Sequence, residues 1–174
     1  LGEHEGVVVY DPSNMFYLSG YTGEGLVLVA RGISAIITDF RYTEQAQAQA
    51  PGFEVLMTEK GKSHEDIAGA LCASGGIDTL YYEDDFVTAR RERGRGVEWK
   101  VVGSEIARLR EIKDEDELAL IRQACRITGE AFERILPHIK EGVTERDLAL
   151  EIEFFMRKQG AEGIAFPPIV AAGK

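Results

Sequence analysis

The chain has 174 residues, enough for one or two domains, and 44% of them are hydrophobic, as in an ordinary soluble globular protein. Its formal net charge of −10 argues against a nucleic-acid-binding protein, which needs clustered Lys and Arg, and against binding to an anionic membrane surface. No apolar run approaches the roughly 20 residues of a membrane span. Cys72 and Cys125 lie far apart in apolar contexts, so we expect two buried free thiols and a reducing, cytoplasmic compartment.

Six short runs in the first hundred or so residues predict β-strands, because each is apolar or β-branched and is bounded by turn-forming residues. Two of these runs flank Gly32 directly, which predicts a hairpin. The run that starts at Gly6 has no polar alternation, which is typical of a central strand buried on both faces. The predicted strands are 6–10, 26–31, 33–38, 53–58, 79–82 and 97–102.

Helical segments are predicted between these strands. Residues 42–50 are rich in Ala, Gln and Glu, which are good helix formers. Ser63 and Asp66 resemble a capping box, and either Ser13 or Asn14 is expected to cap a brief helix after the first strand. Strand–helix–strand units that follow a hairpin predict an α/β domain with a mixed sheet. The predicted helices of this part are 15–19, 42–50, 63–73 and 84–93.

From residue 104 to about residue 160 the sequence predicts helices, and the first of these is a short connecting helix at 104–110. Acidic residues at 114–117 favour the start of a long helix, because they lie at the positive end of its dipole. Thr144 and Asp147 resemble a second capping box, and Gly160 ends the second helix. Apolar residues of the first helix recur every three or four positions and form one stripe. The stripe comprises Leu118, Ile121, Cys125, Thr128, Phe132 and Ile135.

The two helices are expected to form a hairpin with two apolar faces. Glu130 with Arg134, and Glu153 with Arg157, are predicted i,i+4 ion pairs along them. Residues 166–174 predict the start of a buried strand, and this short run is too little to cover both faces. We therefore expect the chain to be part of a longer protein.

Individual residue types give no strong signal for catalysis. His4, His64 and His138 are scattered and match no metalloprotease or zinc spacing, so surface positions are the simplest interpretation. The glycines of loop 20–25 have the spacing G-x-x-G-x-G, which is not a dinucleotide fingerprint, and a glycine turn is favoured over phosphate binding. The acidic residues 83–85 bind a cation or, more simply, begin a helix in solvent.

Four segments match, in order along the chain, the motifs of one protein family. The first pattern is N-x-x-Y-L-S/T-G-F/Y-T-G and the second is T-D-x-R-Y-x-x-Q-A. The third is R-x-x-K followed by E-I/L-x-x-I/L-R-x-A, and the fourth is G-x-T-E, G-A-E-G and F-x-x-I-V-A-x-G. The matching residues are 14–23, then 38–46, then 110–113 with 117–124, and finally 142–145, 160–163 and 166–173.

Together these motifs resemble the creatinase/prolidase/aminopeptidase P family of metallopeptidases, and bacterial Xaa-Pro peptidases in particular. The resemblance implies a creatinase-type amino-terminal domain at 1–110, with a mixed-sheet, ribonuclease-H-like α/β fold. Residues 111–174 would then be the first helical hairpin and strand of an incomplete pita-bread catalytic domain of α+β class. The implied activity is that of a hydrolase, a dipeptidase or aminopeptidase that cleaves peptide bonds before proline in a cytoplasmic homodimer.

In that family, two divalent metal ions (manganese, cobalt or zinc) are held by two Asp, one His and two Glu, and they activate hydroxide. None of these ligands matches a position up to Lys174, so the resemblance implies no catalytic residue and no metal ligand here, and no turnover by this chain alone. The loop after Y-L-x-G reaches the partner's active site in family dimers, and Phe166 precedes the strand beside the pocket for the first side chain. The implied substrate-binding residues are Tyr21, Thr22, Gly23, Glu24 and Phe166.

Simpler interpretations remain open beside these. The alternative interpretations are a surface turn for the loop and core packing for Phe166. A peptidase-like fold also serves as a non-catalytic binding module for partner peptides, which substituted metal ligands would indicate. A creatinase-like hydrolase of a small guanidino compound would need an arginine in loop 21–25, and this loop has none.

Overall fold

The computed structural model describes residues 1–83 and 97–173, so the helix predicted at 84–93 lies outside the described residues. The chain divides into two compact units, Leu1–Glu111 (unit 1) and Ile112–Lys174 (unit 2). Within the described ranges, no helix combines the length and the hydropathy of a transmembrane span.

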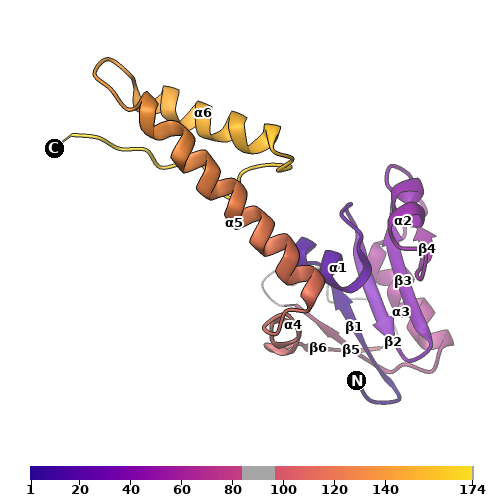
Figure 1. Ribbon diagram of the computed structural model, residues 1–174. Coiled ribbons are helices and arrows are strands. Elements are labelled where there is room, and N and C mark those ends of the chain that lie inside the picture. The colour runs from indigo at the N-terminus through magenta and orange to yellow at the C-terminus, as the bar shows by residue number, and fades with distance from the viewer. Residues whose placement is uncertain (84–96, 174) are drawn as a thin grey trace. The chain divides into compact units, whose positions relative to one another are not determined.

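The strands described in unit 1 form one mixed sheet with the order β4-β3-β2-β1-β5-β6 (Figure 1). β2 is antiparallel to both β1 and β3, and the other neighbouring strands are parallel. The hairpin around Gly32 is confirmed, and each predicted strand lies within one residue of the observed bounds. These bounds are β1 Glu5–Val9, β2 Leu26–Ala30, β3 Ile33–Thr38, β4 Glu54–Met57, β5 Thr79–Tyr82 and β6 Glu98–Val101.

The helices of unit 1 begin at defined caps. Asp11 caps the first helix, because its carboxylate accepts a hydrogen bond from the backbone N–H of Asn14 at 2.8 Å. The prediction of Ser13 or Asn14 as the cap was therefore wrong: Pro12 occupies the first turn, where its missing N–H costs nothing. The capping box of Ser63 is confirmed. The helices are α1 Pro12–Ser19, α2 Thr43–Gln49, α3 His64–Ser74 and α4 Glu105–Leu109.

Both faces of the sheet are covered. On β1, Val8 faces the cluster that includes Cys72 of α3, whereas Val9 faces the cluster that includes Met15 of α1. Val8 and Val9 are fully buried, as the apolar run predicted. Because α1, α2 and α4 contribute to one face and α3 to the other, the sheet is a rigid support for the loops at its ends.

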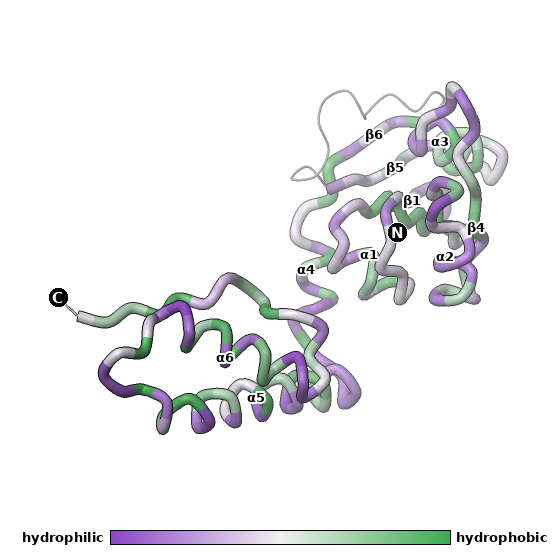
Figure 2. The backbone as a smooth tube through the Cα atoms, turned by 90° about the horizontal axis from the view of Figure 1, so that it is seen from above, coloured by the Kyte–Doolittle hydropathy of each residue, from purple (hydrophilic) through white to green (hydrophobic). Residues whose placement is uncertain are grey.

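Unit 2 is a helical hairpin of α5 (Glu115–Ile135) and α6 (Glu145–Lys158), with a short 3-10 turn η1 (Leu136–His138) after α5. Asp114 caps α5, and the capping box of Thr144 at the start of α6 is confirmed. Apolar and polar residues alternate along both helices (Figure 2). The alternation gives each helix an apolar face, as predicted.

The buried face of α5 shares only Ile135 with the predicted stripe. Ile127, Ala131 and Ile135 are buried, whereas Phe132 is 59% exposed. Cys125 is exposed as well, so the prediction of a buried thiol was wrong at this position and right at the buried Cys72. The physical reason is that α6 packs against α5 in the hairpin, and burial depends on which residues face that partner.

The predicted strand at 166–174 does not form in the described residues up to Gly173. This segment is irregular, and Ile169 is 89% exposed. A strand needs a neighbouring strand to satisfy its backbone hydrogen bonds, and the described part of unit 2 offers none. The segment is instead hydrogen-bonded to α6: the backbone N–H of Ala172 donates to Oε1 of Glu145 at 2.7 Å.

Candidate functional site

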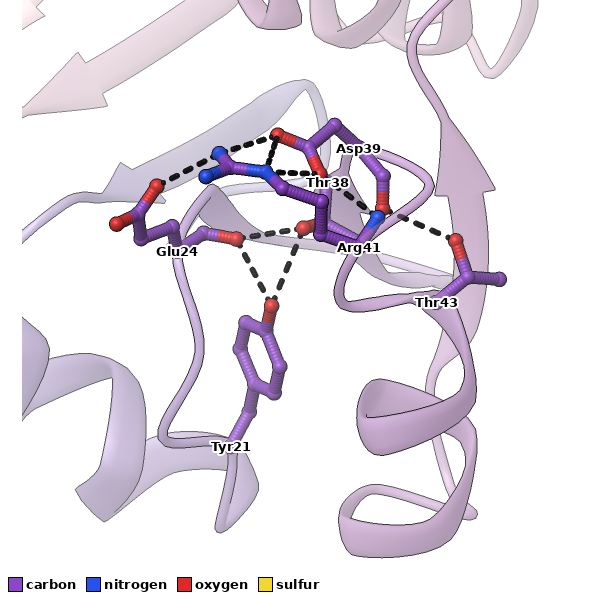
Figure 3. Close-up of polar contacts among 6 residues, drawn as sticks. All are labelled: Tyr21, Glu24, Thr38, Asp39, Arg41 and Thr43. Carbon is purple, nitrogen blue, oxygen red and sulfur yellow. Dashed lines mark hydrogen bonds and ion pairs between the residues drawn. The ribbon is translucent and has the colours of Figure 1, made fainter.

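Loop 20–25 connects α1 to β2, and the buried side chain of Tyr21 supports this loop from the protein interior. The Tyr21 side chain is fully buried, and its hydroxyl donates to the backbone carbonyl of Glu24 at 2.8 Å (Figure 3). The hydroxyl of Thr38 donates to the same carbonyl at 2.6 Å. Burial raises the pKa of the Tyr21 hydroxyl, which stays protonated as a donor. Any contact of the loop with a ligand therefore falls to its other residues.

The glycines of the loop allow it to pack closely on its own supports. Gly25 has φ +138°, and a Cβ there would overlap the carbonyl oxygen of Ile37. A Cβ at Gly23 would overlap the Tyr21 hydroxyl. The glycine spacing seen in the sequence thus serves the packing of a turn, which accounts for it without a bound phosphate.

Thr22 is exposed and is held by two glutamines of α2. Its hydroxyl accepts from Nε2 of Gln45 at 2.9 Å and from Nε2 of Gln49 at 3.0 Å, and its backbone N–H donates to Oε1 of Gln49 at 3.0 Å. Gln45 and Gln49 lie one helical turn apart, so both reach the same residue. The hydroxyl of Thr22 is therefore fixed in direction although it faces solvent.

An ion network holds Glu24. The Arg41 guanidinium contacts Oε2 of Glu24 at 2.9 Å and Oδ2 of Asp39 at 2.7 Å (Figure 3). Hydrogen bonds from Arg41 hold the pKa of the Asp39 carboxyl below its usual range, and the same contacts raise the pKa of Arg41. Because the network is open to solvent, it contributes little to the stability of the fold and chiefly orients the Glu24 side chain.

Beside the loop lies a cavity of about 410 Å³ at the carboxyl ends of β1 and β3. Its ionisable lining residues are Glu24, Asp39, Arg41, His64 and Glu65. Glu65 is buried, and one of its oxygens accepts a hydrogen bond from the hydroxyl of Tyr10 at 3.2 Å. Charged groups of both signs in a partly enclosed space suit the binding of a small zwitterionic or peptide-like ligand.

A pair of divalent metal ions does not fit the residues that the structure describes. Within 1–83 and 97–173, no three His, Cys, Asp or Glu side chains gather closely enough to hold a metal ion. Such a pair needs several carboxylates and a histidine around one point. No chemical step through a metal ion is therefore derived from these residues.

The predicted site residues are split between the units. Tyr21, Thr22, Gly23 and Glu24 lie together in unit 1, whereas Phe166 belongs to unit 2, where it is 71% exposed on the irregular segment. Contact of Thr22, Gly23, Glu24 and Phe166 with substrate stays a prediction, whereas the buried Tyr21 supports the loop from inside.

The residues that hold the loop were missed as site residues. Thr38 and Arg41 bind Glu24, and Gln45 binds Thr22. These three are polar positions of the second sequence motif, T-D-x-R-Y-x-x-Q-A. That motif begins on the last residue of a predicted strand, which is the signal that could have placed its side chains beside the loop.

The mixed sheet with helices on both faces defines unit 1 as an α/β domain. The family model described as Creatinase/Prolidase N-terminal domain matches residues 3–112, and the model described as Metallopeptidase family M24 matches residues 119–174. The chain therefore belongs to the creatinase/prolidase family of peptidases.

Similar proteins and structures carry related names. The chain is 35% identical to "Uncharacterized peptidase YqhT" of Bacillus subtilis, over 97% of this chain and 49% of that protein. The structure of an Xaa-Pro dipeptidase from Bacillus anthracis is similar with a TM-score of 0.83 and 33% identity, over 91% of this chain and 45% of that one. The structure of an X-Pro aminopeptidase from Thermotoga maritima is similar with a TM-score of 0.83 and 30% identity, over 94% of this chain and 49% of that one. The chain spans about half the length of the curated relatives it matches.

Proposed function

We propose that the intact protein is a metal-dependent Xaa-Pro peptidase, of dipeptidase or aminopeptidase type, that hydrolyses the peptide bond before proline. The observation that carries this proposal is the match of both units, in order, to the two family models. The names of the similar structures, an Xaa-Pro dipeptidase and an X-Pro aminopeptidase, support the substrate class.

The metal pair, whether manganese, cobalt or zinc, would be bound by residues other than those described here. This chain alone would then bind no metal pair and would not turn over substrate. The family-model match to metallopeptidases supports a divalent metal in general, and the choice among the three ions comes from the resemblance alone.

In this proposal, the loop of Thr22, Gly23 and Glu24 contacts the substrate and limits its length in a cytoplasmic homodimer, while Tyr21 supports the loop from inside. Three features support this role: the loop is held rigidly, it exposes polar groups, and it borders a cavity with charges of both signs. Phe166 would border the pocket for the first side chain of the substrate.

The test is an assay of the intact protein with Met-Pro and with Met-Ala, in the presence of manganese. We expect Met-Pro to be cleaved, Met-Ala to be cleaved at least about tenfold more slowly, and a chelator to abolish turnover. The 174-residue chain, assayed in parallel, should release no product. Binding of Met-Pro without hydrolysis by the metal-loaded intact protein would instead identify a non-catalytic binding module and refute the peptidase.

A further inference from the structure

Two sequence motifs that are distant in the chain meet at the end of unit 1. Asn14 and Tyr17 of the first motif lie three residues apart on α1, so their side chains leave the helix on one side. The Tyr17 hydroxyl donates to the backbone carbonyl of Leu109 at 3.0 Å. The guanidinium of Arg110, in the R-x-x-K motif, donates to Oδ1 of Asn14 at 2.7 Å. One short helix thus binds two consecutive residues more than 90 positions further along the chain.

Asn14 uses both ends of its amide in this arrangement. Its Nδ2 donates to Oε1 of Glu83, which is only 8% exposed. The other oxygen of Glu83 accepts from the backbone N–H groups of Tyr10 at 2.7 Å and Asp11 at 2.8 Å. An amide can donate to a carboxylate and accept from a guanidinium at the same time, which a carboxylate or a hydrocarbon side chain cannot do. Asn14 therefore links the buried Glu83 to Arg110.

The bound residues lie at the carboxyl end of α4. Ile106, near the start of this helix, is buried in the core of unit 1. The last carbonyls of a helix have no partner within it, and Tyr17 supplies a donor for that of Leu109. Apolar burial thus holds the start of α4 and two hydrogen bonds hold its end, one residue before unit 1 ends at Glu111.

We propose that Asn14, Tyr17 and Arg110 form a clamp that fixes the direction in which the chain leaves unit 1. They are positioning residues for the last turn of unit 1, at the carboxyl end of α4. Without the clamp, the last turn of unit 1 would be held mainly by Ile106. The clamp is a property of unit 1 itself, so its test requires no peptidase activity and stands apart from the proposed function.

The test is residue-resolved amide exchange by NMR on the 174-residue chain. The backbone N–H groups of Arg108 and Arg110 are bonded to Ser104 and Ala107, so they report on the last turn of α4. Tyr17→Phe and Arg110→Gln should each speed their exchange about fivefold, the effect of one lost hydrogen bond. Arg110→Lys should restore most of the protection, because an ammonium group also donates to Asn14.

The matched control is Tyr10→Phe, which removes a tyrosine hydrogen bond to Glu65. It should leave the exchange of Arg108 and Arg110 unchanged. Wild-type exchange rates in both clamp variants, or no recovery with Arg110→Lys, would overturn the clamp. Equal acceleration of the amide of Leu28, in the central sheet, would show that these side chains serve the whole unit, and this too would overturn it.

Discussion

The two units differ in how completely their apolar side chains are covered. In unit 1, side chains such as Leu28 and Ile37 are fully buried between the sheet and its helices. In unit 2, three residues of the 21-residue helix α5 are buried, whereas Phe132 and Phe154 are more than half exposed. Both units show clear apolar periodicity in sequence. Periodicity therefore predicts that a helix forms, and the packing partner decides which of its residues are buried.

The largest expected effect is in thiol chemistry. Burial raises the pKa of the Cys72 thiol in unit 1 to about 11, whereas Cys125 in unit 2 is exposed. At pH 8 only about 0.1% of Cys72 would be thiolate, the form that reacts. We expect a thiol reagent to label Cys125 at least about 100-fold faster than Cys72. Cys125→Ser and Cys72→Ala variants separate the two rates by mass spectrometry, and fast labelling of Cys72 in folded protein would contradict the burial of this residue.

A smaller effect is expected from truncating apolar side chains. Leu28→Ala removes fully buried atoms and should lower the free energy of unfolding by about 3 kcal/mol. Phe132→Ala removes a mostly exposed ring, so the loss should be below about 0.5 kcal/mol. Urea unfolding followed by Trp99 fluorescence reports on unit 1, and helical circular dichroism reports on both units. Similar losses for the two variants would show that Phe132 is covered in solution.

The smallest effect on stability is expected from two aspartates with lowered pKa, one in each unit. Arg41 lowers the pKa of Asp39, and hydrogen bonds from Thr144 lower that of Asp147. A lowered pKa in the folded state stabilises the fold above the ordinary value of about 3.9, and this contribution is lost as the pH falls through the lowered value. Arg41→Gln should return the pKa of Asp39 toward its ordinary value and leave the pKa of Asp147 unchanged. Carboxyl-carbon NMR titration measures both, and an unchanged Asp39 would refute the assigned cause.

Local patterns predicted the elements of the fold well. The strand that ends at Thr38 and the capping boxes at Ser63 and Thr144 are confirmed, because each depends on residues close together in sequence. The prediction of a strand at 166–174 was wrong for residues 166–173, which the structure describes. A strand depends on a neighbouring strand, and the local sequence pattern does not contain that information. The strand order of the sheet was not predicted, since pairing joins residues far apart.

Ion pairs illustrate the same limit. The predicted i,i+4 pair of Glu153 and Arg157 is confirmed at 3.0 Å. Arg134, predicted to pair with Glu130, instead contacts Glu151 of α6 at 2.8 Å. Helical spacing identifies partners on one helix, but a second helix brings competing carboxylates that the spacing does not reveal.

For the candidate site, family motifs identified the exposed loop residues, but not what holds them. That Tyr21 is buried, and that Arg41 orients Glu24, follows from contacts between a loop and a strand end that lie 17 residues apart. The motifs contained these residues without indicating that they meet. Sequence thus predicted where the loop is, and the structure added how it is supported.

The carbonyl of Glu24 that accepts from both Tyr21 and Thr38 separates the shape of the loop from its chemistry. The hydroxyls of Tyr21 and Thr38 fix the backbone of the loop at position 24 from inside the protein, whereas Arg41 and Gln45 orient the outward side chains at positions 24 and 22. The inner hydrogen bonds to this carbonyl would remain if either outward side chain were exchanged. A domain built this way can acquire a new ligand preference through surface substitutions alone, without a new fold.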